Sequence, residues 1–339
     1  MTSRIRLQPL PILFCFLSFS FAIRSADNPK VVIDPRAKPV AAPAVEGPRT
    51  DIRVDTTVVL VPVTVTNPLN QFVTGLEKTN FRVYEDKVEQ EVAYFASDDA
   101  PLSVGLVFDT SGSMGNKLGK SRQAVSQFFR TANPEDEVFI VNFNDEAYLE
   151  EPGFTSDIKL LERGLSKLDS RGGTAMRDAI RMSMDYLKEN GKKDKKLLVV
   201  VTDGEDNYSN VTLENLVRDL QRTETPIQVY TIGLLSEEER REAKKAERAL
   251  IAIADASGGA SYIPKENSDV EKVCQQVAKD IRSQYIIEYN PVMSELDGSF
   301  RSIKVLATAP NGPKVRTRSG YYATPEKGSS PTAGASAKK

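Results

Sequence analysis

The sequence predicts an α/β protein with a doubly wound, mostly parallel sheet, joined to a small all-β, sandwich-like part. Between residues 102 and 283, apolar strand-like runs alternate with amphipathic helical patterns. Strands separated by helices imply right-handed crossovers and hence a parallel sheet. Residues 53–98 and 284–323 instead show the two-residue alternation of half-buried strands. At 339 residues and 40% apolar composition, the chain can bury a sizeable core.

The α/β part begins with a short apolar run after Pro101. Strands are expected at residues 104–108, 138–143, 197–201 and 227–232. The spacing of Met114, Leu118, Val125 and Phe129 predicts a helix after the first strand. Further helices are expected at residues 156–168, 175–189, 212–222, 236–256 and 268–283.

The two β segments flank the α/β part along the chain. Strands are expected at residues 53–66, 81–85 and 88–96, and again at 285–290, 300–307 and 315–322. Pro62 places the first strand at a sheet edge or a bulge, and Lys87 stands in a hairpin turn where glycine is expected. Each segment alone buries too little surface to fold. The simplest architecture is therefore one sandwich built from both, with the α/β domain inserted between them.

The N-terminal residues 1–26 have the pattern of a secretory signal peptide. Arg4 and Arg6 precede an apolar run over residues 10–22, and small residues follow. That run is shorter than the ~20 residues a spanning helix needs, so we expect an exported protein without a membrane span after cleavage. Its place would be the periplasm, the cell surface or outside. Residues 27–52 are expected to be a Pro/Ala-rich linker, and residues 324–339 a disordered tail.

Composition excludes several classes of function. The chain contains no histidine, which rules out His-dependent triads and His-containing zinc sites. Removing residues 1–26 takes away three of 45 basic residues and none of 47 acidic ones, so the net charge falls from −2 to −5. That balance gives no electrostatic reason to expect nucleic-acid binding. Cys274 would be the one remaining cysteine, and we expect a buried apolar role for it.

Three short motifs follow predicted strands or precede predicted helices. The first strand ends in Asp109-Thr110-Ser111-Gly112-Ser113, and 197–202 is followed by Asp203-Gly204. Gly172-Gly173-Thr174 comes before a predicted helix. In open parallel sheets, ligands bind beyond the carboxyl ends of the strands, so we expect these loops to meet. Carboxylate and hydroxyl oxygens suit Mg²⁺, Ca²⁺ or Mn²⁺ better than zinc or copper.

The order and spacing of these motifs resemble the metal-ion-dependent adhesion site of von Willebrand factor A domains. All five family positions are matched, by Asp109, Ser111, Ser113, Thr174 and Asp203. The similarity covers roughly residues 102–283, and the flanking β segments look like those of secreted bacterial proteins related to that family. The resemblance implies a Rossmann-like sheet and a bound divalent cation. Mg²⁺ is the expected ion, and Ca²⁺ and Mn²⁺ are the alternatives.

The resemblance also implies a mechanism. In such domains the hydroxyls bind the metal directly, the aspartates act partly through water, and one open position receives an Asp or Glu of a protein partner. With only two carboxylates in reach, the cation would keep residual positive charge for that incoming group. We therefore expect a non-enzymatic, metal-dependent protein-binding module. The sequence leaves its partner and its oligomeric state open.

Plainer interpretations stand beside this one. Asp109 and the serines could cap a helix, and Asp178 is expected in the first turn of its helix rather than at the metal. Asn142 and Asn144 are expected in a turn, while Glu205 and Asp206 are placed at the rim. A scaffold role, in which the cation only rigidifies loops, is the second function considered. A metal-assisted hydrolase is the least favoured, because Ser111-Gly112-Ser113 lacks the first glycine of a nucleophile elbow and no histidine exists to activate Ser113.

Overall fold

The computed structural model describes residues 58–97, 100–204, 206–222, 225–235, 238–266 and 269–324. All described residues lie within one unit of the chain, Val54–Lys339. The expected signal peptide, linker and, apart from Thr324, tail fall outside the described residues. Among the residues described, no helix is both long and apolar enough to cross a membrane.

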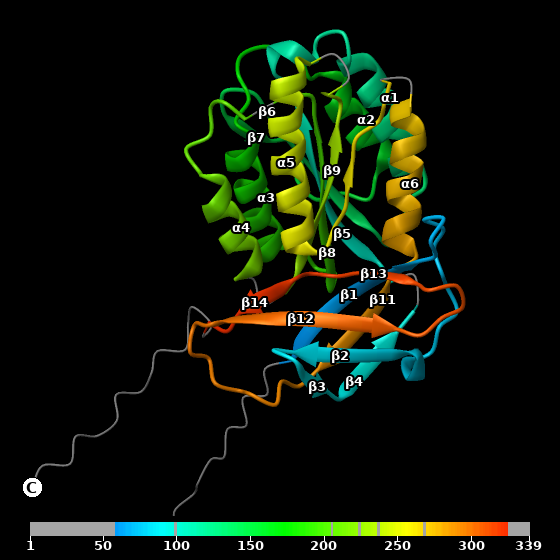
Figure 1. Ribbon diagram of the computed structural model, residues 1–339. Coiled ribbons are helices and arrows are strands. Elements are labelled where there is room, and N and C mark those ends of the chain that lie inside the picture. The colour runs from blue at the N-terminus through cyan, green and yellow to red at the C-terminus, as the bar shows by residue number, and fades with distance from the viewer. Residues whose placement is uncertain are drawn as a thin grey trace, which may run out of the picture. The chain divides into compact units, whose positions relative to one another are not determined.

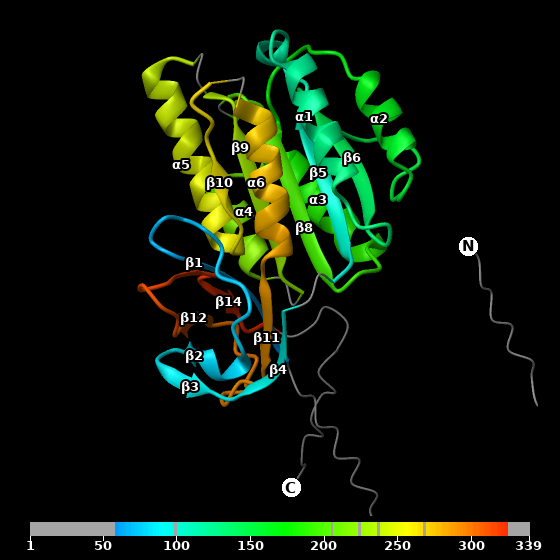
Figure 2. The ribbon, with the colours of Figure 1, turned by 90° about the vertical axis from the view of Figure 1, so that its right-hand side faces the viewer.

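A six-stranded sheet forms the centre of the α/β part, in the order β10-β9-β8-β5-β6-β7 (Figures 1 and 2). Its strands are β5 (Leu102–Asp109), β6 (Glu137–Phe143), β7 (Ala147–Leu149), β8 (Lys195–Thr202), β9 (Ile227–Gly233) and β10 (Ser261–Tyr262). All neighbouring pairs are parallel except β6 with β7. The predicted doubly wound α/β class is thus confirmed, while the edge strands β7 and β10 were not anticipated.

Helices cover both faces of this sheet. They are α1 (Leu118–Arg130), α2 (Ile158–Ser166), α3 (Met176–Asn190), α4 (Leu213–Gln221), α5 (Arg240–Ser257) and α6 (Val270–Arg282). Along β5, Leu106 and Phe108 pack in one core cluster with apolar residues of α1, α2 and α6. Val107 points the other way, into a second cluster with residues of α3, α4 and α5. Alternation along a central strand thus supplies two cores, one on each face.

Two four-stranded antiparallel sheets form the β part, in the orders β13-β1-β11-β4 and β14-β12-β2-β3. Their strands are β1 (Val59–Thr66), β2 (Phe81–Glu85), β3 (Val88–Gln90), β4 (Val92–Ala96), β11 (Tyr285–Tyr289), β12 (Phe300–Ala307), β13 (Lys314–Arg316) and β14 (Gly320–Tyr322). Both sheets share one apolar core, which includes Val61, Val83 and Ile287. Strands from before and after the α/β part are therefore neighbours, as β1 with β11 and β2 with β12.

Two predicted strands are each divided between the sheets. The predicted run 88–96 breaks at Glu91, so that β3 pairs with β2 and β4 pairs with β11. The predicted run 315–322 likewise becomes β13, which pairs with β1, and β14, which pairs with β12. Treating each run as one strand was wrong, because within each run the chain turns a corner and passes from one sheet to the other.

The structure agrees with the prediction for Pro62 in β1 and differs from the predicted start of α5. Pro62 lies opposite Ile286 of β11, whereas β13 pairs only with Thr64–Thr66. The side of β1 that lacks a partner at Pro62 is a local edge, as proline requires. The predicted helix 236–256 begins later, at Arg240, and the segment from Gly112 to Met114 is a short 3₁₀ turn ahead of α1.

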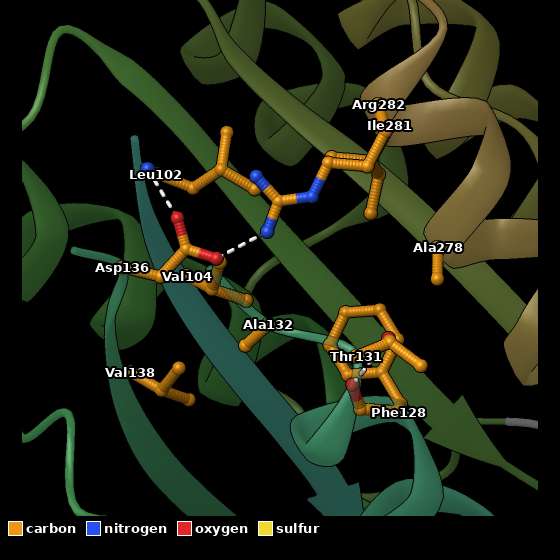
Figure 3. A pocket seen from close by; sticks show the side chains of 10 residues that line it. All are labelled: Leu102, Val104, Phe128, Thr131, Ala132, Asp136, Val138, Ala278, Ile281 and Arg282. Carbon is orange, nitrogen blue, oxygen red and sulfur yellow. Dashed lines mark hydrogen bonds and ion pairs between the residues drawn. The ribbon is translucent and has the colours of Figure 1, made fainter. Parts of the chain in front are cut away.

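A small cavity of about 10 Å³ lies near the start of β5, beside α1 and α6 (Figure 3). Asp136 borders it and accepts a hydrogen bond from the backbone N–H of Leu102 at 2.9 Å. The other oxygen of Asp136 pairs with Arg282 at the end of α6. The volume is about that of one water-sized probe, so this region is a packed junction rather than a ligand site.

Candidate metal centre

The five candidate residues belong to loops at one edge of the α/β sheet. Asp109 is the last residue of β5, and Asp203 follows the last residue of β8. The chain moves outward from β5 to β6 on one side and later to β8 on the other, so the strand order reverses between β5 and β8. In open α/β sheets this reversal separates the loops and leaves a crevice suited to a ligand.

Asp109 is fully buried and held by its neighbours. Its Oδ1 accepts the backbone N–H of Ser111 at 2.8 Å, and its Oδ2 accepts the hydroxyl of Thr202 at 2.6 Å. Burial raises the pKa of Asp109 to about 6, since the hydrogen bonds only partly offset desolvation and nearby Asp203 adds repulsion. The carboxylate therefore gains from any cation that approaches it.

Ser111, Ser113 and Asp203 form a connected row of oxygens. The hydroxyls of Ser111 and Ser113 are 3.1 Å apart, and Ser113 donates to Oδ1 of Asp203 at 2.8 Å. Ser111 and Asp203 are buried, whereas Ser113 is exposed. Neighbouring oxygens of an octahedral Mg²⁺ at 2.0–2.1 Å are spaced roughly 2.8–3.0 Å apart, so this row fits a small hard cation with one side facing solvent.

The loop that carries Thr174 is joined to the Asp109–Ser113 loop through its main chain. Gly112 N–H donates to the carbonyl of Gly172 at 3.0 Å, and Arg171 N–H donates to the carbonyl of Thr110 at 2.8 Å. Gly172 has a φ of +75°, and a Cβ there would lie 2.4 Å from Oδ2 of Asp145, so glycine is required. Thr174 itself is buried, and its N–H donates to Asn207. The structure thus brings its loop to the site by backbone contacts.

Lys117 is a residue of this site that the sequence interpretation missed. Its Nζ lies 2.7 Å from Oδ2 of Asp203 and 3.4 Å from Glu238. Burial disfavours the ammonium, but Asp203 and then Glu238 outweigh that effect, so the pKa of Lys117 is raised. A lysine within a helical pattern ordinarily lies on the solvated face. The available signal was its place between Met114 and Leu118, two core residues.

The other polar residues near the site organise its loops. Asp178 lies in the first turn of α3, and its carboxylate accepts the N–H groups of Asn210 and Val211. Asp206 accepts the backbone N–H of Arg177 at 2.7 Å, so the rim position expected for it understates its structural role. Asn144 lies in the turn after β6, as expected, while Asn142 is inside β6 and donates to Glu150. Glu205 lies outside the described residues.

The site is poor in strong metal ligands other than oxygen. Within the described part of the chain, no group of three or more His, Cys, Asp or Glu side chains is placed to hold a metal ion. Two aspartates with hydroxyls thus remain as the ligand set, which favours a hard cation over zinc or copper. Cys274 is buried within the core and burial raises its pKa to about 12, in agreement with the apolar role expected for it.

A comparison with protein families matches residues 104–205 to the von Willebrand factor type A domain. All five candidate residues fall inside this range. Residues 104–205 belong to the von Willebrand factor type A domain family. The predicted resemblance is confirmed at this level, and the von Willebrand factor type A domain is the part of the chain that bears the candidate site.

Two curated proteins and a solved structure are similar to parts of this chain. Inter-alpha-trypsin inhibitor heavy chain H4 of Bos taurus is 26% identical over 145 residues, which are 39% of this chain and 16% of that protein. The corresponding protein of Mus musculus is 25% identical over 148 residues, 38% of this chain and 15% of its own length. The chain therefore spans about a sixth of these relatives. A solved von Willebrand factor type A protein from Catenulispora acidiphila has a TM-score of 0.47 at 14% identity, covering 78% of this chain and 73% of that one.

Proposed function

We propose that the protein is a metal-dependent protein-binding module. The observation that carries this proposal is the row of oxygens from Ser111, Ser113 and Asp203, at 3.1 and 2.8 Å spacing, with Ser113 facing solvent. A cation bound there would have protein ligands behind it and an accessible side for an acidic residue of a partner. The family membership of residues 104–205 supports the same function.

Mg²⁺ is the proposed ion. Mg²⁺ is bound by few protein oxygens and keeps several waters, which suits two hydroxyls and one carboxylate oxygen in a compact row, whereas Ca²⁺ takes six to eight oxygen ligands. Mn²⁺ is close in size to Mg²⁺ and serves as a spectroscopic substitute. Ser111, Ser113 and Asp203 would hold the ion, together with Thr174 and Asp109. The ion would supply positive charge for an incoming carboxylate.

A non-enzymatic role is part of this proposal. The chain contains no histidine to serve as a general base. The hydroxyl of Ser113 donates to Asp203 and neighbours Ser111, and in this proposal Asp203 acts as a metal ligand rather than as a base for that hydroxyl. Export is proposed as well, on the basis of the N-terminal pattern around Arg4 and Arg6.

The decisive experiment compares partner capture with and without chelator. Full-length protein, Asp203→Asn and the control Asp185→Asn would be used to capture proteins from native extract in Mg²⁺ and in EDTA. Asp185 is a suitable control because its side chain is 63% exposed on α3. We expect capture by wild type and Asp185→Asn in Mg²⁺ only, and none by Asp203→Asn. Capture that is indifferent to EDTA would contradict the proposal.

Partner capture, measured together with the melting temperature, separates this function from a scaffold role. If the ion bridges to a partner, chelation abolishes capture and lowers the melting temperature only by the contribution of the bound ion itself. If the ion only rigidifies loops, chelation lowers the melting temperature by several degrees, because loss of a ligand that binds only the folded state removes its contribution to stability. Loss of stability without any cation-dependent partner would favour the scaffold.

A further inference from the structure

Lys117 occupies a position that ordinarily disfavours a cation. It is the residue before α1, where backbone N–H groups carry partial positive charge. Its backbone is fixed, since its N–H donates to Met114 and its carbonyl accepts from both the N–H and the hydroxyl of Ser121. Its side chain is only 3% exposed. A buried ammonium at a helix N-terminus costs stability unless it has a specific partner.

That partner is a carboxylate of the candidate metal centre. Nζ of Lys117 lies 2.7 Å from Oδ2 of Asp203, while Oδ1 of Asp203 accepts the hydroxyl of Ser113. Both oxygens of Asp203 are thus engaged by the protein itself. A divalent ion bound beside Ser113 would repel the ammonium in an environment that water screens weakly.

Glu238 offers the ammonium a second acceptor. Its Oε1 lies 3.4 Å from Nζ of Lys117, and its side chain is 23% exposed. It precedes α5 and lies 121 residues after Lys117 in the sequence. A short displacement of the ammonium toward Glu238 would shorten this pair and lengthen the one with Asp203, without exposing Lys117 to solvent.

We propose that Lys117 is an internal cation that competes with the divalent ion for Asp203, and that Glu238 accepts the ammonium when the ion binds. This inference rests on the proposed function and concerns its regulation. In the metal-free protein Lys117 holds Asp203 in place and compensates its charge. Metal affinity is consequently lower than the oxygen ligands alone would give. After the ion is released, Lys117 again compensates the charge of Asp203 and holds its carboxylate in place.

The test measures Mg²⁺ and Mn²⁺ binding to the full chain by calorimetry. Lys117→Met removes the competing charge and keeps an unbranched side chain. We expect its dissociation constant for the ion to fall roughly tenfold or more, and its metal-free melting temperature to fall below that of wild type. Lys120→Met is the matched control, since Lys120 is exposed on α1, and we expect its dissociation constant to stay near that of wild type.

Glu238 is tested by a double-mutant cycle. Glu238→Gln should weaken ion binding several-fold, while Glu239→Gln, an exposed neighbour, should change it little. If Glu238 acts through Lys117, Glu238→Gln should have no further effect in the Lys117→Met protein. An equal effect in both backgrounds would overturn the role assigned to Glu238 and indicate simple charge attraction.

The remaining outcomes separate this inference from the proposed function. Lys117→Arg keeps the charge and should keep wild-type affinity, so tighter binding by that variant would contradict competition. Unchanged or weaker binding by a folded Lys117→Met protein overturns the inference while leaving the metal site intact. Absence of ion binding by wild type and all variants would instead overturn the proposed function, and this inference with it.

Discussion

At the scale of single residues, the two buried aspartates of the site are stabilised in different ways. Asp109 has hydrogen bonds from Thr202 and the backbone of Ser111. Asp203 has the full positive charge of Lys117 at 2.7 Å. A buried carboxylate with dipoles alone stays costly to ionise, whereas one paired with an ammonium is compensated. Burial accordingly raises the pKa of Asp109 to about 6 in the metal-free protein.

We predict that metal-free protein loses stability as pH rises from about 4 to 6. The pKa of Asp109 is raised from 3.8 to about 6 by burial, so between these values the folded state binds more protons than the unfolded state. The stabilising contribution is complete below about 3.8 and is lost as pH passes 6. It amounts to roughly 2–3 kcal/mol at most. Urea denaturation in EDTA, across this pH range, measures it.

The matched variant is Asp109→Asn, which keeps the shape of the protonated acid. The difference in unfolding free energy between wild type and this variant should change as pH rises from about 4 to 6. The contributions of all other titrating groups cancel in this difference. Added Mg²⁺ should oppose the loss in wild type, because the ion binds the ionised carboxylate. If the difference in unfolding free energy between wild type and Asp109→Asn stays constant between about pH 4 and 6, the raised pKa of Asp109 is contradicted.

At the scale of elements, the β2–β3 hairpin uses an uncommon turn residue. Asp86 and Lys87 have φ values of 45° and 72°, which the two-residue turn between antiparallel strands requires. Asp86 fits because its Oδ1 accepts both the N–H and the hydroxyl of Ser302 at 2.9 Å. Lys87 has no such contact with the residues that the structure describes to offset its left-handed backbone. The turn itself forms as the sequence predicts, and Lys87 stands where glycine would be unstrained.

We predict that Lys87→Gly raises the free energy of unfolding by about 0.5–1 kcal/mol, because glycine adopts positive φ without a Cβ clash. Chemical denaturation of the full chain measures the change. Asp86→Gly is the informative comparison, since it relieves the same strain but removes two hydrogen bonds, and it should give no gain or a net loss. Equal stabilisation by both variants would show that the contacts with Ser302 contribute nothing.

At the scale of the whole molecule, one buried carboxylate links the sandwich to the α/β part. Asp280, near the end of α6, is fully buried. It accepts hydrogen bonds from Tyr262 at 2.6 Å, from Thr64 of β1 at 3.2 Å and from Arg316 of β13 at 2.5 Å. Because β1 and β13 lie at opposite ends of the described chain, this group gathers segments that are far apart in sequence. The α/β insertion and its flanking strands are thereby coupled.

We predict that Asp280→Ala lowers the free energy of unfolding by about 3–5 kcal/mol, because it leaves the guanidinium of Arg316 without its carboxylate. Equilibrium denaturation followed by circular dichroism measures this. The double variant Asp280→Ala with Arg316→Met should be less destabilised than Asp280→Ala alone, since removing both charges avoids an unpaired one. If the second substitution instead adds its own full cost, the ion pair is not the source of the effect.

Local patterns determined much of this protein. The apolar strand runs, the helical spacings and the alternation in β1 each indicate structure through neighbours in sequence, and the predicted α/β class follows from their order. The candidate site was also predictable, because Asp109 and Asp203 come directly after buried strands and parallel strands end at a common edge. Glycines at Gly172 and Gly173 marked the third loop.

The tertiary structure decided what depends on contacts between distant segments. No Gly or Pro marks a break in the run 88–96, so only the pairing of β3 with β2 and of β4 with β11 reveals a sheet corner at Glu91. Lys117 and Asp203 are 86 residues apart, and a lysine in a helical pattern carries no sign of its partner. Sequence records the chemistry and local conformation of each segment. Which charged side chains pair in the interior is decided only when the chain folds, because burial and pairing are properties of the tertiary structure.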